Sequence, residues 1–213
     1  VALLCLLVFP FQASAQRLSA ATDGQRPANA NPGSQEFVGM IKLFDNLHYV
    51  GTNFVGALLL ETSDGLILID SIYQDFTAQA LQAITDAGFD PGEIRYVLVS
   101  HGHQDHFGGA MEVKAVSGAT IGMLAEDWAM SGLDTDMVIE DGDTLELGDN
   151  TLLFYQTPGH TQGVMSIVFS VRDGDNSHRA FLLGGHNVPS NRVEDFELFM
   201  PAVERMQGLL NNV

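Results

Sequence analysis

The chain has 213 residues, of which 46% are apolar and 8% aromatic, and it contains a single Cys. This length and composition predict one globular domain with a sizeable hydrophobic core. Acidic residues outnumber basic residues by 27 to 9, which gives a formal net charge of -18. Because such a surface repels nucleic acids and anionic membranes, we exclude both as partners.

The first 15 residues have the pattern of a targeting segment. Residues 1–11 are apolar but too few to span a bilayer, and Ala13-Ser14-Ala15 is a small-residue cleavage pattern. We expect a partial signal peptide at residues 1–15, cleaved before Gln16, which implies a periplasmic or secreted protein. A short membrane anchor is the alternative. Since Cys5 would leave with the peptide, the mature chain would have neither disulfides nor a cysteine-bound zinc.

A polar linker is expected at residues 16–35 and a single domain at 36–213. Short apolar runs bounded by turns predict strands, and apolar residues at helical spacing predict helices. The strands are expected at 40–44, 48–51, 54–61, 66–69, 94–99, 119–123, 144–147, 152–155, 165–171 and 180–183. The helices are expected at 76–87, 110–117, 126–130 and 193–210. Because helices interleave with strands in both halves, the pattern predicts an α/β (α+β) fold with two layers of sheet.

Metal-binding side chains gather directly after the predicted buried strand 94–99. They are His101, His103, Asp105 and His106. In an extended loop, residues two apart point to the same side, so His101 and His103 can bind one metal ion together. Asp105 and His106 would then face a neighbouring point. A polar solvent-exposed loop is the alternative, which we disfavour because so many ligand types seldom cluster in this way without a metal.

A third ligand for the first metal is expected from His160. It lies on the segment Thr157–Thr161 between two predicted strands, beside Gly159, which permits an unusual backbone angle. A turn histidine without a ligand role is the alternative. The hypothesis therefore requires His160 to lie within coordinating reach of His101 and His103.

Together these motifs resemble those of the metallo-β-lactamase superfamily. The resemblance covers roughly residues 40–190 and rests on His101-x-His103-x-Asp105-His106, Gly108-Gly109, Pro158-Gly159-His160-Thr161, Ser63-Asp64-Gly65 and Ile69-Asp70. The segment Tyr49-Val50-Gly51-Thr52, the lack of Cys in the mature chain and the expected export are most similar to the third subclass of class B β-lactamases and related exported zinc hydrolases.

The resemblance implies a four-layer αβ/βα sandwich with its site at one edge of the sheets. It assigns His101, His103 and His160 to a first zinc site, and Asp105 and His106 to a second, so we expect two Zn²⁺ per chain. A metal-bound hydroxide would attack an acyl carbonyl. Asp105 would orient that hydroxide and is the expected catalytic carboxylate.

Two departures from the family pattern affect the second zinc site. Relatives complete it with a His that follows a late strand, whereas this sequence stops at Val213 after a predicted helix. Relatives also carry Gly-Gly-Cys or Gly-Asp where this chain has Gly184-Gly185-His186. We expect both a C-terminally truncated sequence and a metal-binding role for His186, since imidazole suits zinc. A hydrogen-bonding role for His186 is the alternative.

The expected function is an exported zinc hydrolase that opens a cyclic amide, the β-lactam ring. A superfamily hydrolase acting on a lactone, thioester or sulfate ester is the second possibility, and a non-catalytic zinc-binding protein is the third. Both of the enzyme interpretations imply a small-molecule substrate. Asp70, at the end of a predicted strand, is expected to support the site without binding metal, and His48 and His178 are expected at the surface or at strand edges.

Overall fold

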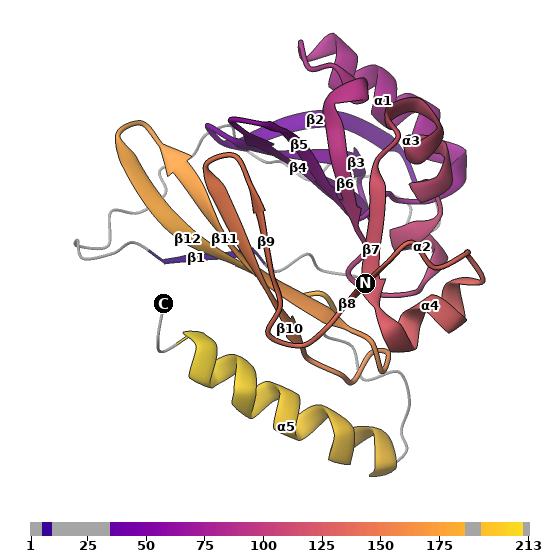
Figure 1. The fold of residues 1–213 in the computed structure, drawn as a ribbon, viewed down its shortest axis with the longest axis vertical. Coiled ribbons are helices and arrows are strands. Elements are labelled where there is room, and N and C mark those ends of the chain that lie inside the picture. Colours follow the sequence, from indigo (N-terminus) through magenta and orange to yellow (C-terminus); the bar gives the residue numbers. More distant parts are fainter. Residues whose placement is uncertain (1–5, 10–34, 186–192, 211–213) are drawn as a thin grey trace.

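The computed structural model describes residues 6–9, 35–185 and 193–210. Two β-sheets face each other, and helices cover their outer faces (Figure 1). The expected metal ligand His186 and most of the expected signal peptide and linker lie outside the described residues, so those assignments stay predictions. Within the described part, no helix combines the length and the apolar character needed to cross a bilayer.

The first sheet has seven strands in the order β2-β3-β4-β5-β6-β7-β8. Neighbours from β2 to β5 pair antiparallel, and those from β5 to β8 pair parallel. The strands are β2 (Phe37–Phe44), β3 (Leu47–Thr52), β4 (Gly56–Thr62), β5 (Gly65–Ile69), β6 (Ile94–Leu98), β7 (Thr120–Leu124) and β8 (Met137–Ile139). Parallel neighbours require crossover connections, and these carry the helices.

The crossover helices lie on the outer face of this sheet (Figure 1). They are α1 (Gln74–Asp86), α3 (Ala110–Ser117) and α4 (Ala125–Ser131). Helix α1 buries Thr77, Ala80 and Ile84, which recur at helical spacing and therefore share one face. Helix α3 ends at Gly118, whose left-handed backbone (φ 71°) closes the last turn.

The second sheet has five antiparallel strands in the order β1-β12-β11-β10-β9. They are β1 (Leu6–Phe9), β12 (Asn176–Leu182), β11 (Met165–Asp173), β10 (Asn150–Gln156) and β9 (Thr144–Leu147). Helix α5 (Val193–Leu210) runs along its outer face (Figure 1). There Met206 packs with Val168 and Phe181 of the sheet.

The hydrophobic core is divided into layers by the two sheets. One cluster, which includes Ile84 and Val113, fills the space between the first sheet and its helices. A second, which includes Leu58, Phe154 and Phe169, lies between the sheets, and the third lies under α5. This arrangement confirms the predicted four-layer αβ/βα sandwich.

Three local features differ from the sequence-based expectations. A short strand, β8, crosses the acidic stretch that begins near Asp134, where a solvated loop is the simplest interpretation of the sequence. The metal-binding motif is helical from Gln104 to Phe107 (α2), so it is an extended loop only in its first half. His48 is buried within β3 with 8% of its surface exposed, so its assignment to the protein surface is wrong.

Candidate metal centre

The loop after β6 carries the first group of candidate ligands. Directly after β6, the N–H of Val99 donates a hydrogen bond to the carbonyl of Gly122 in β7. The chain then turns into α2, and the carbonyl of His103 accepts hydrogen bonds from the N–H groups of His106 and Phe107. Because the loop is anchored to a central strand on one side and a helical turn on the other, its imidazoles have fixed directions.

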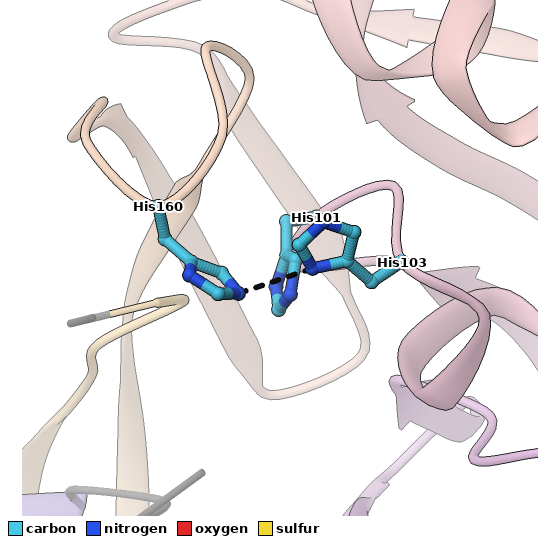
Figure 2. A group of neighbouring side chains, drawn as sticks. All are labelled: His101, His103 and His160. Atoms are coloured by element: carbon cyan, nitrogen blue, oxygen red, sulfur yellow. Dashed lines mark hydrogen bonds between the residues drawn. The ribbon is translucent and has the colours of Figure 1, made fainter. Parts of the chain in front are cut away.

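Three imidazoles from two distant segments meet at one point (Figure 2). One ring nitrogen from each of His101, His103 and His160 lies within 4.8 Å of the other two. Nδ1 of His103 is 3.1 Å from Nε2 of His160, and the ring centroids of His101 and His160 are 4.7 Å apart. Three nitrogens on a tetrahedral zinc with bonds of about 2.0–2.1 Å would lie roughly 3.3 Å apart, so the cluster fits a metal ion.

His101 has the environment of a preset ligand. Its Nδ1 lies 2.9 Å from the carbonyl oxygen of Gly184, so Nδ1 carries the proton and Nε2 keeps its lone pair. Nε2 is buried and has no hydrogen-bond partner. Burial, together with the neighbouring imidazoles of His106, His160 and His103, holds the pKa of His101 far below its ordinary value. The ring therefore stays neutral, which is the state that binds a metal.

His160 is delivered by the loop between β10 and β11. The N–H of Thr157 donates to the carbonyl of Val164, and the N–H of Gly159 donates to the carbonyl of Thr161, which folds the loop back on itself. Gly159 has φ 151°, and a Cβ atom there would lie 2.3 Å from Cδ2 of Phe199 in α5. A glycine is therefore required at the position before His160.

His106 and Asp105 lie beside the three-histidine cluster but do not belong to it. The ring of His106 is 3.9 Å from that of His101, and its Nε2 is 3.5 Å from Oδ2 of Asp105. Nδ1 of His106 lies 2.8 Å from Oδ2 of Asp70. Burial alone would lower the pKa of His106, but the carboxylates of Asp70 and Asp105 outweigh it and raise that pKa.

Asp70 has a supporting position, as the sequence suggests. Its carboxylate is buried and accepts hydrogen bonds from the N–H and the hydroxyl of Ser100 at 2.7 and 3.0 Å. The backbone of Asp70 is left-handed, with φ 63°, and Ile72 close by has φ 52°. The left-handed region is tolerated by an Asp but unfavourable for a β-branched residue such as Ile72, and such strain is maintained only where the surroundings fix the conformation.

Sequence reasoning missed Asp127, which lies at the first turn of α4 and is completely buried. Its carboxylate accepts hydrogen bonds from Gly102, Thr161 and Gly163, so it contacts both ligand-bearing loops. The sequence offers one signal for the burial of Asp127, which is its position. Asp127 follows Leu124 by three residues and adjoins Trp128, and both of these apolar residues are buried. A carboxylate on the apolar face of a helix requires a specific set of donors.

A comparison with protein families gives a match to the metallo-beta-lactamase superfamily over residues 50–173, which includes the three-histidine cluster. The chain belongs to the metallo-beta-lactamase superfamily. The resemblance inferred from the histidine motifs is thereby confirmed.

Solved structures of superfamily members share the fold. BJP-1, a subclass B3 metallo-beta-lactamase of Bradyrhizobium japonicum, superposes with a TM-score of 0.71 at 26% identity over 78% of this chain and 72% of its own. LRA-12, a class B3 di-zinc metallo-beta-lactamase from an Alaskan soil metagenome, gives a TM-score of 0.72 over 81% of this chain and 75% of its own. Its identity is 22%, so this second similarity shows the fold alone.

The curated proteins that are similar to this chain in sequence are named hydroxyacylglutathione hydrolases, whereas the solved structures above are named β-lactamases. A hydroxyacylglutathione hydrolase of Acidiphilium cryptum is 36% identical over 92 residues, which are 43% of this chain and 36% of the relative. The chain thus spans about a third of the length of the curated relatives it matches. The structural and the sequence neighbours therefore point to different substrates.

Proposed function

We propose that this protein is an exported zinc-dependent hydrolase that opens the cyclic amide of a β-lactam. The convergence of His101, His103 and His160 carries the proposal, because it brings one ring nitrogen of each residue to within 4.8 Å of the other two. Zinc is supported by this ligand set. The subclass B3 structure of BJP-1, which covers 78% of this chain at 26% identity, supports the β-lactam substrate.

The residues of the site have separable tasks in this proposal. Nε2 of His101, Nδ1 of His103 and Nε2 of His160 would hold a first zinc, and Asp105 and His106 would contribute to a second. Zinc, when bound, lowers the pKa of a coordinated water towards neutrality. The carboxylate of Asp105 would orient the attacking water and accept its proton, while Asp70 keeps the proton of His106 on Nδ1. The place of His186 in the second site stays a prediction.

A thioester is the second candidate substrate, since the curated relatives are hydroxyacylglutathione hydrolases. The two candidates differ in the bond cleaved, C–N in the lactam and C–S in the thioester, while the attack on the carbonyl is the same. The local match of about 90 residues does not determine the leaving-group pocket, so the substrate has to be tested directly.

The test is hydrolysis by the purified protein at saturating zinc, with a carbapenem, a hydroxyacylglutathione and an acyl-homoserine lactone as parallel substrates. We expect turnover of the carbapenem and its loss to the buffer rate in His103→Ala. His178→Ala, which removes an imidazole on β12 outside the cluster, is the matched control and should keep full activity. Turnover of the thioester alone would replace the β-lactam proposal with the second candidate.

Export belongs to the same proposal and rests on the apolar residues 1–11 followed by Ala13-Ser14-Ala15. We expect the mature protein in the periplasmic or culture fraction with Gln16 as its first residue. N-terminal sequencing of protein recovered from fractionated cells tests this. An intact segment 1–15 on protein found in the membrane fraction would favour an anchor instead.

A further inference from the structure

The carboxylate of Asp127 lies between the two loops that carry the three histidines. Its Oδ2 accepts the N–H of Gly102 at 2.7 Å and the hydroxyl of Thr161 at 2.6 Å. Its Oδ1 accepts the N–H of Gly163 at 2.9 Å. The side chain is 0% exposed, so water does not replace these bonds. Each donor therefore supports a buried charge, and charge-assisted bonds of this kind are stronger than neutral ones.

Two of the three donors are direct sequence neighbours of the candidate ligands. Gly102 lies between His101 and His103, and Thr161 directly follows His160. One oxygen atom, Oδ2, thus connects both sides of the cluster through groups adjacent to the ligands. The separation of His160 from the other two histidines therefore depends on this shared acceptor, together with the backbone bond from the N–H of Met165 to the carbonyl of Ser100.

Glycines let both loops approach Asp127 closely. A Cβ atom on Gly102 would lie 2.8 Å from the backbone oxygen of Asp127, and one on Gly163 would lie 2.7 Å from its Cγ. Any larger residue at either place would push a ligand loop away from the carboxylate. The two glycines and the buried acid therefore form one unit of local packing.

We propose that Asp127 is a positioning residue that sets the distance between His160 and the pair His101 and His103, and so sets the metal affinity of the first site. This inference rests on the proposed metal site. It differs from a general stabilising role because it predicts a change in coordination geometry, which loss of stability alone does not produce.

Asp127→Asn is the most direct variant. An amide has one acceptor oxygen, so its NH₂ group must face either the N–H of Gly163 or the two donors from Gly102 and Thr161, and at least one of the three bonds that hold the loops is lost. We expect the dissociation constant for zinc, measured by chelator competition, to rise on the order of 10- to 100-fold, the range seen when a group supporting a metal ligand is lost. The visible spectrum of the cobalt(II)-loaded protein should also change, because it reports coordination geometry.

Thr161→Val and Thr161→Ser supply a second, milder pair. Valine keeps the shape but loses the hydroxyl that donates to Oδ2, so zinc affinity should fall by less than in Asp127→Asn. Serine keeps the hydroxyl and should restore both the affinity and the cobalt spectrum. This pair also tests the proposal if Asp127→Asn does not fold, as judged by far-ultraviolet circular dichroism.

The structural control is Asn150→Ala. Asn150 is 4% exposed and bonds to the backbone of Ser170 in the second sheet, so its loss should lower stability without touching the loops. The inference is overturned if Asp127→Asn and Thr161→Val bind zinc and cobalt like the unaltered protein while resembling Asn150→Ala in stability. Failure of the unaltered protein to bind either metal would instead overturn the proposed metal site, so the two failures are distinct.

Discussion

The carboxylate of Asp70 lies 2.8 Å from Nδ1 of His106 and joins the end of β5 to the metal-binding motif. The same carboxylate accepts two hydrogen bonds from Ser100, the residue before His101. Asp70 therefore fixes His106 directly and the start of the ligand loop through Ser100. Asp70 thus supports His106, a candidate ligand of the second zinc site, as we propose that Asp127 supports the three histidines of the first.

Asp70→Asn should weaken the second metal more than the first. Asparagine tolerates the left-handed backbone at this position, so the change removes the charge while keeping the chain path. The pKa of His106 should fall because burial is no longer opposed by Asp70. We expect the affinity for the second zinc to drop about 10- to 100-fold in a metal titration followed by elemental analysis.

Asp70→Ala is the companion variant for that measurement. It adds left-handed strain of about 1–2 kcal/mol to the same loss of charge, so it should unfold at lower denaturant than Asp70→Asn. Identical zinc titrations for Asp70→Asn and the unaltered protein would show that Asp70 does not support the second site.

Gly159→Ala tests how closely α5 controls the position of His160. The new Cβ atom would meet Phe199 at 2.3 Å, so either α5 or the His160 loop must move. We expect a loss of about 1–3 kcal/mol in stability and weaker zinc binding. Gly174→Ala is the matched control: its φ is also positive, at 57°, but nothing lies within 4 Å of the added atom, so only stability should fall.

The double variant Gly159→Ala with Phe199→Ala separates steric contact from backbone strain. Removal of the ring should recover zinc affinity, since the added methyl group then has room. If the double variant bound zinc as weakly as Gly159→Ala, backbone strain alone would be responsible and the contact with α5 would be irrelevant.

His48 should make the stability of the metal-free protein depend on pH. Burial lowers the pKa of His48 below 6.5, with Glu61 opposing and Lys42 adding to the shift. Its Nδ1 has no hydrogen-bond partner, and the ring packs edge-on against Phe89 at 5.1 Å. The unfolded chain therefore takes up a proton as pH falls through 6.5 while the folded chain does not, so stability is lost below that pH.

Urea unfolding of metal-free protein at pH 7.5, 6.5 and 5.5 checks this expectation. His48→Phe keeps an aromatic ring against Phe89 but cannot be protonated, so its stability should fall less between pH 6.5 and 5.5. Other histidines contribute equally to both proteins and cancel in the difference. Parallel stability profiles for the two proteins would contradict the assignment.

Removal of metal should lower the free energy of unfolding. Three imidazoles that face one point are stabilised by a shared cation, and a ligand bound only to the folded state adds about 2.7 kcal/mol at 100 times its dissociation constant. The single Trp, Trp128, is 4% exposed and reports unfolding by fluorescence. Stability that did not change between chelator and excess zinc would contradict a metal site that exists only in the folded state.

The sequence predicted most of the strands and helices, because apolar periodicity is a local signal, and it predicted the convergence of His160 with His101 and His103 from the ligand types and the family resemblance that they carry. Alternating or continuous apolar runs mark strands such as β5 and β6, and so dense a run of imidazoles seldom occurs without a bound metal. The fold then brings together the ends of β6 and β10, which no periodicity within either segment reveals.

The features that the sequence did not predict depend on contacts between distant segments. In the sequence, Asp127 does not differ from other acidic residues of a short helix. Only the fold shows that the N–H groups of Gly102 and Gly163 donate hydrogen bonds to its carboxylate. Strand β8 forms in an acidic stretch because it pairs with β7, and Asp136 there binds Lys114 and the N–H of Ile121. His48 is buried because α1 and Phe89 pack against β3. The residue pattern of one strand does not reveal such a contact.

Strand β1 covers the outer edge of β12 through the pairs Leu6–Leu182, Leu7–Phe181 and Val8–Ala180. These residues belong to the segment that we expect a peptidase to remove. A chain without them would present the backbone amides and carbonyls of β12 as an unprotected template, on which a strand from another molecule can add. Self-association of this enzyme in storage would then depend on how its leading residues are processed.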